Sequence, residues 1–310
     1  MVLVHLGKHW YARRHYPFVS WAACVARSAR VLLFYRDHRG LLGLDVYRRH
    51  LTQIHDDVFH HLSHRNYLAR GLSLRERVRC VQTHYRFETA TFDAAYQQAV
   101  YRDGGLVVWQ HDADGVRCTI QLEMAERLNA EGDLTLTARL DGIRLHRLSF
   151  SWVDSGFAGV PAASTPAVVR TIVPFVARNQ GHHAEAAEAF KVFERIFPQN
   201  SPSFFCFAAL QGIARMLGME QVVAVKATAQ CAYDPARDTQ FGNAYDGFWQ
   251  TLGGTPLAGR GWRIPLPLQL KALAEMSAKH RKRAAQRRAY WADIGDAAGA
   301  AVARHLLARP

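Results

Sequence analysis

The chain has 310 residues, of which 49% are hydrophobic and 11% are aromatic, so it can bury the core of one large domain or two ordinary ones. Lysine and arginine number 39 against 26 aspartates and glutamates, which gives a formal net charge of +13. This composition excludes a disordered chain. The charge favours acidic partners such as nucleic acid, anionic lipid or a phosphate-bearing ligand.

The sequence also bears on the compartment. The five cysteines stand far apart and form no CxxC pair, which predicts neither a zinc ribbon nor a disulfide framework: Cys24, Cys80, Cys118, Cys206 and Cys231. Residues 1–10 are too polar for a signal peptide, and Arg27 and Arg30 interrupt the apolar passage 18–35, so no transmembrane segment is expected. We expect a cytoplasmic protein, with a membrane-peripheral location as the alternative.

Helical periodicity runs from residue 10 to about 101, where Leu72, Val78 and Tyr85 share one side of a helix. The pattern then changes to period two, with Asp-Gly pairs at 114–115 and 141–142 that predict tight hairpins. The strands expected in this part are 106–110, 116–122, 134–140 and 143–153.

The second half alternates strands and helices. Strands are expected at 168–176, 221–228 and 261–266, and helices at 181–197, 202–217, 243–252 and from 270 onward. This order predicts a mixed α/β fold, a largely antiparallel mixed sheet flanked by helices and preceded by a helical N-terminal region. We divide the chain into a helical region (1–103), a mixed-sheet domain (104–268) and a basic C-terminal helical segment (269–310).

Several strings give a family resemblance. The strings at 131–152 (EGDLTLTARLDGIRLHRLSFSW), 243–254 (NAYDGFWQTLGG) and 279–294 (KHRKRAAQRRAYWADI), with Asn66-Tyr67-Leu68 and His84-Tyr85, resemble the landmarks of the bacterial VirK/YbjX family in order and spacing. The resemblance covers about residues 60 to 295. It implies a protein connected with virulence and envelope stress and does not imply a particular reaction.

A more remote resemblance concerns the element order, which is similar to that of the acyl-CoA-dependent GNAT-type N-acyltransferases. In that fold a strand ends in a loop with the pattern (Gln or Arg)-x-x-Gly-x-(Gly or Ala), and backbone N–H groups at the next helix bind a pyrophosphate. Arg178 and Gly181 fit this pattern, whereas His183 stands where a small residue is expected. The resemblance implies donor binding by six residues: Arg178, Gln180, Gly181, His182, His183 and Asn243.

The resemblance also implies a helix whose tyrosine protonates the departing thiolate. Here Trp249 occupies that position, and an indole N–H cannot serve as a general acid near neutral pH. Tyr245, one turn earlier on the same face, is the proton donor that we predict. His84 or His146 would deprotonate the amine if a base is required.

Three polar patterns each allow two interpretations. His84 and Glu88 lie one helical turn apart, as a structural pair or as a base oriented by a carboxylate. The cluster from His55 to His64 puts Asp56, His60 and His64 on one helical face, which is either solvated or metal-binding. The run from Lys279 to Arg288 fits either a solvated helix or contact with an anionic membrane or RNA.

The sequence has no Gly-x-Ser-x-Gly elbow, Walker loop or dinucleotide fingerprint. We therefore predict an acyl- or aminoacyl-transferase that moves an acyl group from acyl-CoA or a similar phosphate-bearing co-substrate to a small-molecule or peptide amine, with no tightly bound cofactor and no metal. The competing interpretation is a non-catalytic, membrane-peripheral envelope-stress factor. The third is a metal-dependent oxygenase that uses the histidine-rich helix.

Overall fold

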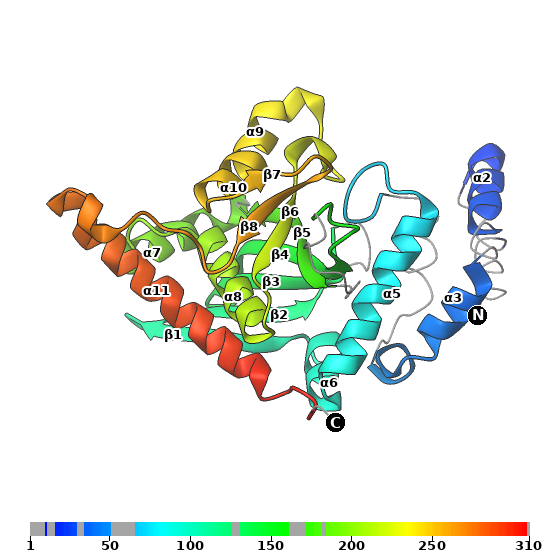
Figure 1. Ribbon diagram of the computed structural model, residues 1–310, viewed down its shortest axis with the longest axis horizontal. Coiled ribbons are helices and arrows are strands. Elements are labelled where there is room, and N and C mark those ends of the chain that lie inside the picture. The colour runs from blue at the N-terminus through cyan, green and yellow to red at the C-terminus, as the bar shows by residue number, and fades with distance from the viewer. Residues whose placement is uncertain are drawn as a thin grey trace, which may run out of the picture.

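The computed structural model describes residues 10, 16–29, 34–50, 66–125, 131–160, 171–181 and 184–308. Its centre is an eight-stranded sheet of order β1-β2-β3-β4-β5-β6-β8-β7 (Figure 1). The strands are β1 (Leu106–Ala113), β2 (Val116–Met124), β3 (Leu134–Leu140), β4 (Ile143–Asp154), β5 (Ile172–Gly181), β6 (Gln221–Val225), β7 (Thr255–Pro256) and β8 (Gly261–Pro265). The helices are α2 (Phe18–Ala29), α3 (Tyr35–Leu42), the π-helical η3 (Val46–His50), α5 (Leu74–Thr91), α6 (Ala94–Tyr101), α7 (Ala187–Ile196), α8 (Pro202–Met216), α9 (Asp238–Gly242), the π-helical η7 (Asn243–Gly247), α10 (Phe248–Thr251) and α11 (Ala278–Ala303), with short 3-10 turns that include η4 (Ala184–Ala186) and η5 (Ala227–Ala229).

Strands β1 to β5 form an antiparallel series. The two Asp-Gly pairs make the predicted hairpins: Asp114, Gly115, Asp141 and Gly142 all have positive φ, between 47° and 80°. Such turns match the right-handed twist of the strands that they join. The mixed α/β fold with a largely antiparallel sheet is therefore confirmed, and the described part of the N-terminal region is mostly helical.

The sheet changes direction once near its middle. β5 and β6 are parallel and pair at only two positions, Phe175 with Val223 and Val176 with Ala224. β5 then continues to Gly181 along β4, whereas β6 ends at Val225 and the chain turns into η5. The two strands therefore separate after a short shared edge.

The two faces of strands β2 to β4 differ in character. One face carries apolar side chains such as Leu136, Leu148 and Phe150, and α8 packs against β3, β4 and β5. α11 lies across α8 and against β1, while α5 packs against β4 and α6 against β1 and β2 (Figure 1). The opposite face carries hydroxyl side chains, among them Thr135 and Ser149, whose oxygens lie 2.8 Å apart.

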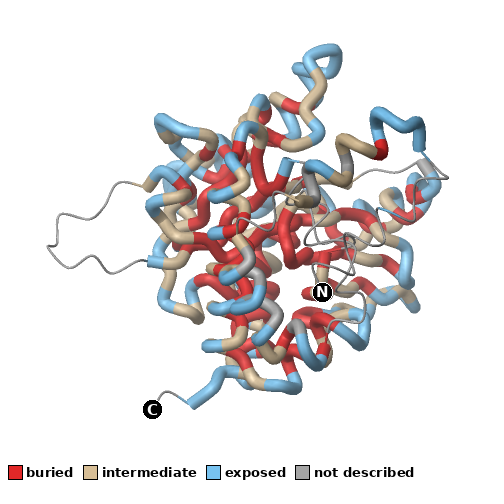
Figure 2. Tube along the Cα trace, turned by 90° about the vertical axis from the view of Figure 1, so that its right-hand side faces the viewer, coloured by how far each residue is buried: buried red, intermediate tan, exposed pale blue. Residues whose placement is uncertain are grey.

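One hydrophobic cluster contains residues from each of the three predicted segments, 1–103, 104–268 and 269–310. Examples are Tyr85, Leu136 and Val302. Figure 2 shows the buried parts of the chain concentrated in the interior, with exposed turns outside. The boundaries after residues 103 and 268 stay a prediction. Among the described residues, no helix is long and apolar enough to cross a membrane.

One element differs from its predicted extent in a way that affects the site. The strand expected at 168–176 is β5, and it extends to Gly181 because the long strand β4 pairs with it as far as His146. Arg178, Gln180 and Gly181 are therefore strand residues rather than loop residues. The following helix, expected from 181, begins as η4 at Ala184 and continues as α7.

Candidate functional site

Two aromatic side chains fill the place where β5 and β6 separate. The Tyr245 hydroxyl accepts hydrogen bonds from the Asn179 backbone N–H at 3.5 Å and from Gln180 Nε2 at 3.1 Å. Trp249 donates from Nε1 to the Val225 carbonyl oxygen at 2.9 Å. Buried backbone groups must be paired, so the two side chains supply partners that a longer parallel ladder would have provided.

The helical segment that carries these aromatics is held from its other side by Asp246. Asp246 Oδ1 accepts from the Ala227 backbone N–H at 2.9 Å and from Trp262 Nε1 at 2.8 Å. These bonds join the segment to η5, which follows β6, and to β8. The π-helical turn η7 includes both Tyr245 and Asp246, and such turns are frequent at functional sites.

His146 lies beside this separation with one ring nitrogen available. Asn179 donates from Nδ2 to the Ala244 carbonyl at 2.8 Å, so its Oδ1 accepts from His146 Nε2, also at 2.8 Å. This arrangement assigns the proton to Nε2 and leaves Nδ1 unprotonated. A Cβ placed on Gly181 would lie 2.6 Å from His146 Nδ1 and 2.7 Å from the Leu145 carbonyl oxygen, so glycine leaves the room that Nδ1 needs.

The charge at this end of β5 is balanced within the protein. Arg178 forms an ion pair with Glu131 at 3.0 Å, and Glu131 also accepts from Gln230 Nε2 at 2.6 Å. The Arg178 Nε atom is buried and has no acceptor among the residues that the structure describes. Arg178 therefore retains one unused donor, although Glu131 offsets its charge.

The structure brings together five of the predicted site residues at the end of β5: His146, Arg178, Gln180, Gly181 and Tyr245. Asn243 is exposed at the start of η7, one residue before the Ala244 carbonyl that holds Asn179. His182 and His183 lie outside the described residues. The donor-binding and catalytic roles of these residues stay predictions.

His84 belongs to a different, fully buried network. Its Nδ1 accepts from the Trp152 backbone N–H and its Nε2 lies 3.2 Å from the Tyr101 hydroxyl. Glu88 accepts from Tyr101 at 3.0 Å, from Trp152 Nε1 at 2.5 Å and from Tyr96 at 3.5 Å. Both ring nitrogens of His84 are thus used inside the core, and of the two candidate bases His146 is the one that has a ring nitrogen, Nδ1, with no hydrogen bond to any described residue.

Burial shifts the pKa values of these groups. Desolvation lowers the pKa of His84 and of His146 to about 4, so both imidazoles are neutral at physiological pH. Desolvation raises the pKa of Glu88 to about 8, although its three donors act in the opposite direction. Glu88 is therefore largely protonated at neutral pH.

A further polar cluster was not predicted from the sequence. Tyr67 donates to Asp133, which also accepts from the Ser151 hydroxyl at 2.5 Å. Tyr67, Asp133 and Ser151 all belong to the strings that carry the family resemblance. Threonine and serine alternate with apolar residues in the segments 134–140 and 143–153, and this pattern could have indicated a polar face of the sheet.

Two other kinds of site receive no support in the part of the chain that the structure describes. Cys80, Cys118, Cys206 and Cys231 form no disulfide within the described ranges, and burial raises the pKa of Cys118 and of Cys231 to about 12, which disfavours a thiolate nucleophile. The described residues contain no group of three or more metal-ligating side chains. The cluster from His55 to His64 lies outside them.

These features define a mixed α/β protein with a polar cluster where two parallel strands separate. The profile described as "Protein of unknown function (DUF535)" matches residues 42–298, so the chain belongs to this family. It is 27% identical over 237 residues to the uncharacterized protein YbjX of Escherichia coli (strain K12), an alignment that covers 73% of this chain and 66% of YbjX, slightly less than two thirds. This relationship bears out the predicted VirK/YbjX resemblance. No solved structure matches significantly.

The buried ionisable groups predict a stability maximum near pH 6.5. Between about pH 6.5 and 4 the unfolded chain protonates His84 and His146 whereas the folded chain does not, so stability falls by about 1.4 kcal/mol per pH unit for each histidine as the pH decreases. Glu88 acts oppositely between about pH 4.5 and 8, because the folded chain binds its proton more tightly. Urea unfolding at pH 5, 6.5 and 8 measures the free energy of unfolding at each pH. A continuous rise in that free energy from pH 6.5 to 8 would contradict the predicted maximum.

Proposed function

We propose that this protein transfers an acyl or aminoacyl group from an activated, phosphate-bearing donor such as acyl-CoA to an amine. The observation that carries the proposal is the parallel pair β5 and β6, which separates after two paired positions inside an otherwise antiparallel series. In the GNAT-type acyltransferases, a comparable separation between parallel strands admits the acyl arm of the donor. The sheet order here is consistent with that arrangement.

In this proposal the acyl end of the donor binds at the separation, where it displaces the hydrogen bond between the Asn179 N–H and Tyr245. The Asn179 N–H points toward Tyr245, and their 3.5 Å hydrogen bond is long enough to be exchanged at low cost for a bond to a donor carbonyl oxygen. A backbone N–H in this position stabilises negative charge that develops on that oxygen. His182 and His183, two of the predicted contacts of the phosphate end, are outside the residues that the structure describes.

The chemistry assigned to the chain is proton transfer and orientation. The donor supplies the activated carbonyl carbon, and in the transfer an N–C bond forms while the bond to the leaving sulfur breaks. Tyr245 gives its phenolic proton to that sulfur; burial raises the pKa of Tyr245, which keeps the phenol protonated until then. His146, with Nδ1 unprotonated beside Gly181, takes the proton that the amine loses.

Replacement of Tyr245 by phenylalanine tests the proposal without disturbing the packing of the ring. We expect kcat to fall by about 100-fold while the dissociation constant for acetyl-CoA changes little, because the proton donor is removed while the ring keeps its packing, and the Asn179 N–H that loses its bond to Tyr245 can still bind the donor. Thiol release from acetyl-CoA in the presence of a panel of amines measures turnover, and calorimetry with acetyl-CoA measures binding.

Tyr290→Phe provides the matched control, since Tyr290 lies on α11, which packs mainly against α8 and β1, and its hydroxyl forms no hydrogen bond within the described chain. Gly181 is less suitable for this test, because any side chain there would collide with His146 and the Leu145 carbonyl. Absence of acetyl-CoA binding by the wild-type protein, or an unchanged kcat in Tyr245→Phe, would refute the proposal.

A further inference from the structure

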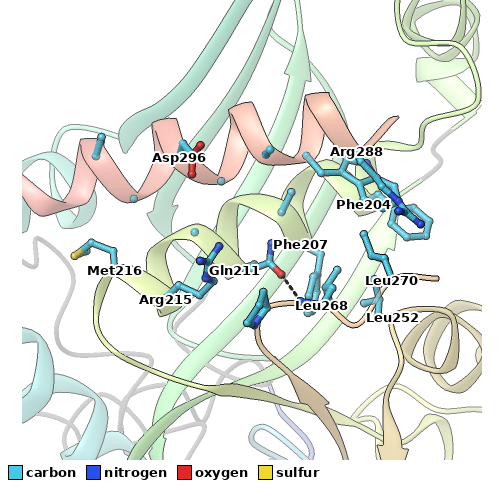
Figure 3. Close-up of a pocket in the computed structure, with 18 of the residues that line it drawn as sticks. Phe204, Phe207, Gln211, Arg215, Met216, Leu252, Leu268, Leu270, Arg288 and Asp296 are labelled. Atoms are coloured by element: carbon cyan, nitrogen blue, oxygen red, sulfur yellow. Dashed lines mark hydrogen bonds between the residues drawn. The ribbon is translucent and has the colours of Figure 1, made fainter. Parts of the chain in front are cut away.

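A pocket lies away from the separation of β5 and β6. It is a pocket of about 720 Å³ between α8 and α11, closed on a third side by Leu252 and by the segment from Pro267 to Leu270 (Figure 3). Its lining residues on α11 run from Arg288 to Ala303, a length of about 22 Å along a helix. Its volume lies within the range of small-molecule sites, and its shape is long rather than compact.

The floor of this pocket is made by helix backbone. α8 and α11 approach so closely at Gly212 and Gly295 that a Cβ on Gly212 would lie 1.9 Å from the Gly295 carbonyl oxygen. Gly299 continues the line one turn further along α11 and also lines the pocket. No side chain therefore fills the groove between the two helices at these positions.

The walls are mainly apolar. The large apolar lining residues are Phe204, Phe207, Met216, Leu252, Leu268, Leu270 and Trp291. Phe204 and Trp291 stack with their ring centroids 4.9 Å apart, which fixes the shape of one end. The polar side chain of Gln211 is already used, because its Oε1 accepts from the Leu268 backbone N–H at 3.0 Å.

Two guanidinium groups give the pocket a positive charge. Arg288 is half-buried at the same end as Phe204 (Figure 3), and it donates to the Lys271 carbonyl oxygen at 2.5 Å. Arg215 is exposed further along α8. In the part of the chain described, neither arginine forms an ion pair, and Asp296, the only acidic residue of the lining, is exposed.

We propose that this groove binds a long, single-chain acyl anion such as a free fatty acid. The alkyl chain lies along the glycine floor between α8 and α11, and the carboxylate binds the guanidinium of Arg288. A long groove between two helices that is lined by apolar side chains favours a flexible chain over a ring system, and arginine binds a carboxylate through two parallel hydrogen bonds. The site does not depend on the acyl transfer proposed above.

Fluorescence titration of the full chain with cis-parinaric acid tests this site. We expect saturable binding by the wild-type protein. Ala292 and Ala300 are exposed positions of the lining, where tryptophan would add a large ring. Each of the variants Ala292→Trp and Ala300→Trp should lower the affinity for parinarate by at least about tenfold. Ala289→Trp is the matched control, because Ala289 is exposed on the same helix outside the pocket and should leave binding unchanged.

The charge is tested separately with Arg288→Gln. This variant should weaken parinarate binding by about tenfold and leave binding of the uncharged methyl ester unchanged. Absence of parinarate binding, or wild-type affinity in both tryptophan variants, would overturn the proposal. Binding of the protein to anionic phospholipid vesicles without binding of free parinarate would overturn it in favour of a membrane-contacting surface. Tyr245→Phe should bind parinarate like the wild type, which separates this site from the proposed acyl transfer.

Discussion

Replacement of Glu88 by alanine is expected to lower the free energy of unfolding by about 3–5 kcal/mol. Glu88 is fully buried and accepts hydrogen bonds from Trp152 Nε1, Tyr101 and Tyr96. The alanine variant leaves the two closer donors, Trp152 and Tyr101, without an acceptor and adds a cavity in the core. Each buried donor without a partner costs about 1–3 kcal/mol. Urea unfolding at pH 6.5 measures the loss.

Two further variants make this test specific. Glu88→Gln should lose less stability, because the side-chain oxygen still accepts, and it should abolish the decline of stability between pH 6.5 and 8. Glu188→Ala is the surface control, since the exposed pair of Glu188 and Lys191 contributes little. A loss below about 1 kcal/mol in Glu88→Ala would show that the network around Glu88 does not support the core.

Replacement of Gly212 by alanine is expected to have the second large effect, a loss of about 3 kcal/mol or more. The added Cβ would lie 1.9 Å from the Gly295 carbonyl oxygen and 2.5 Å from its carbonyl carbon. Both contacts are with backbone, so α8 and α11 must move apart to accommodate even one methyl group. Because α8 also packs against β3, β4 and β5, this movement would loosen the core.

Gly242→Ala is the matched control for this prediction. Gly242 ends α9 and has no atom within 4 Å of an added Cβ, so the substitution should be neutral or slightly stabilising. Thermal and urea unfolding of both variants give the comparison. Equal stability of Gly212→Ala and the wild type would refute the close contact between α8 and α11.

The elements that the sequence predicts well are those determined by local chemistry. The hairpin between β3 and β4 follows from alternating residues on either side of Asp141-Gly142, and both residues have the positive φ that the turn requires. The start of α8 follows from Pro202 in its first turn. The end of β5 was not predictable in the same way, because its extent depends on pairing with the long strand β4.

In the candidate site, too, the sequence predicts the residues that belong to local motifs and not those that depend on tertiary contacts. Tyr245, Arg178 and Gly181 could be selected from short motifs, but Glu131 and Asn179 could not, because their partners lie far away in the sequence. His84 and His146 look equally suited to catalysis as sequence patterns. Tertiary packing distinguishes them, since both nitrogens of His84 are used in the core.

Hydrogen–deuterium exchange with and without acetyl-CoA tests most directly whether the donor lies between β5 and β6. We expect acetyl-CoA to slow deuterium uptake in the peptide that covers residues 177–181. The reason is that the Asn179 N–H would replace its long hydrogen bond to Tyr245 by a hydrogen bond to the donor. Exchange that is unchanged in this peptide under saturating acetyl-CoA, or slowed only in α8 and α11, would contradict acyl transfer at this position.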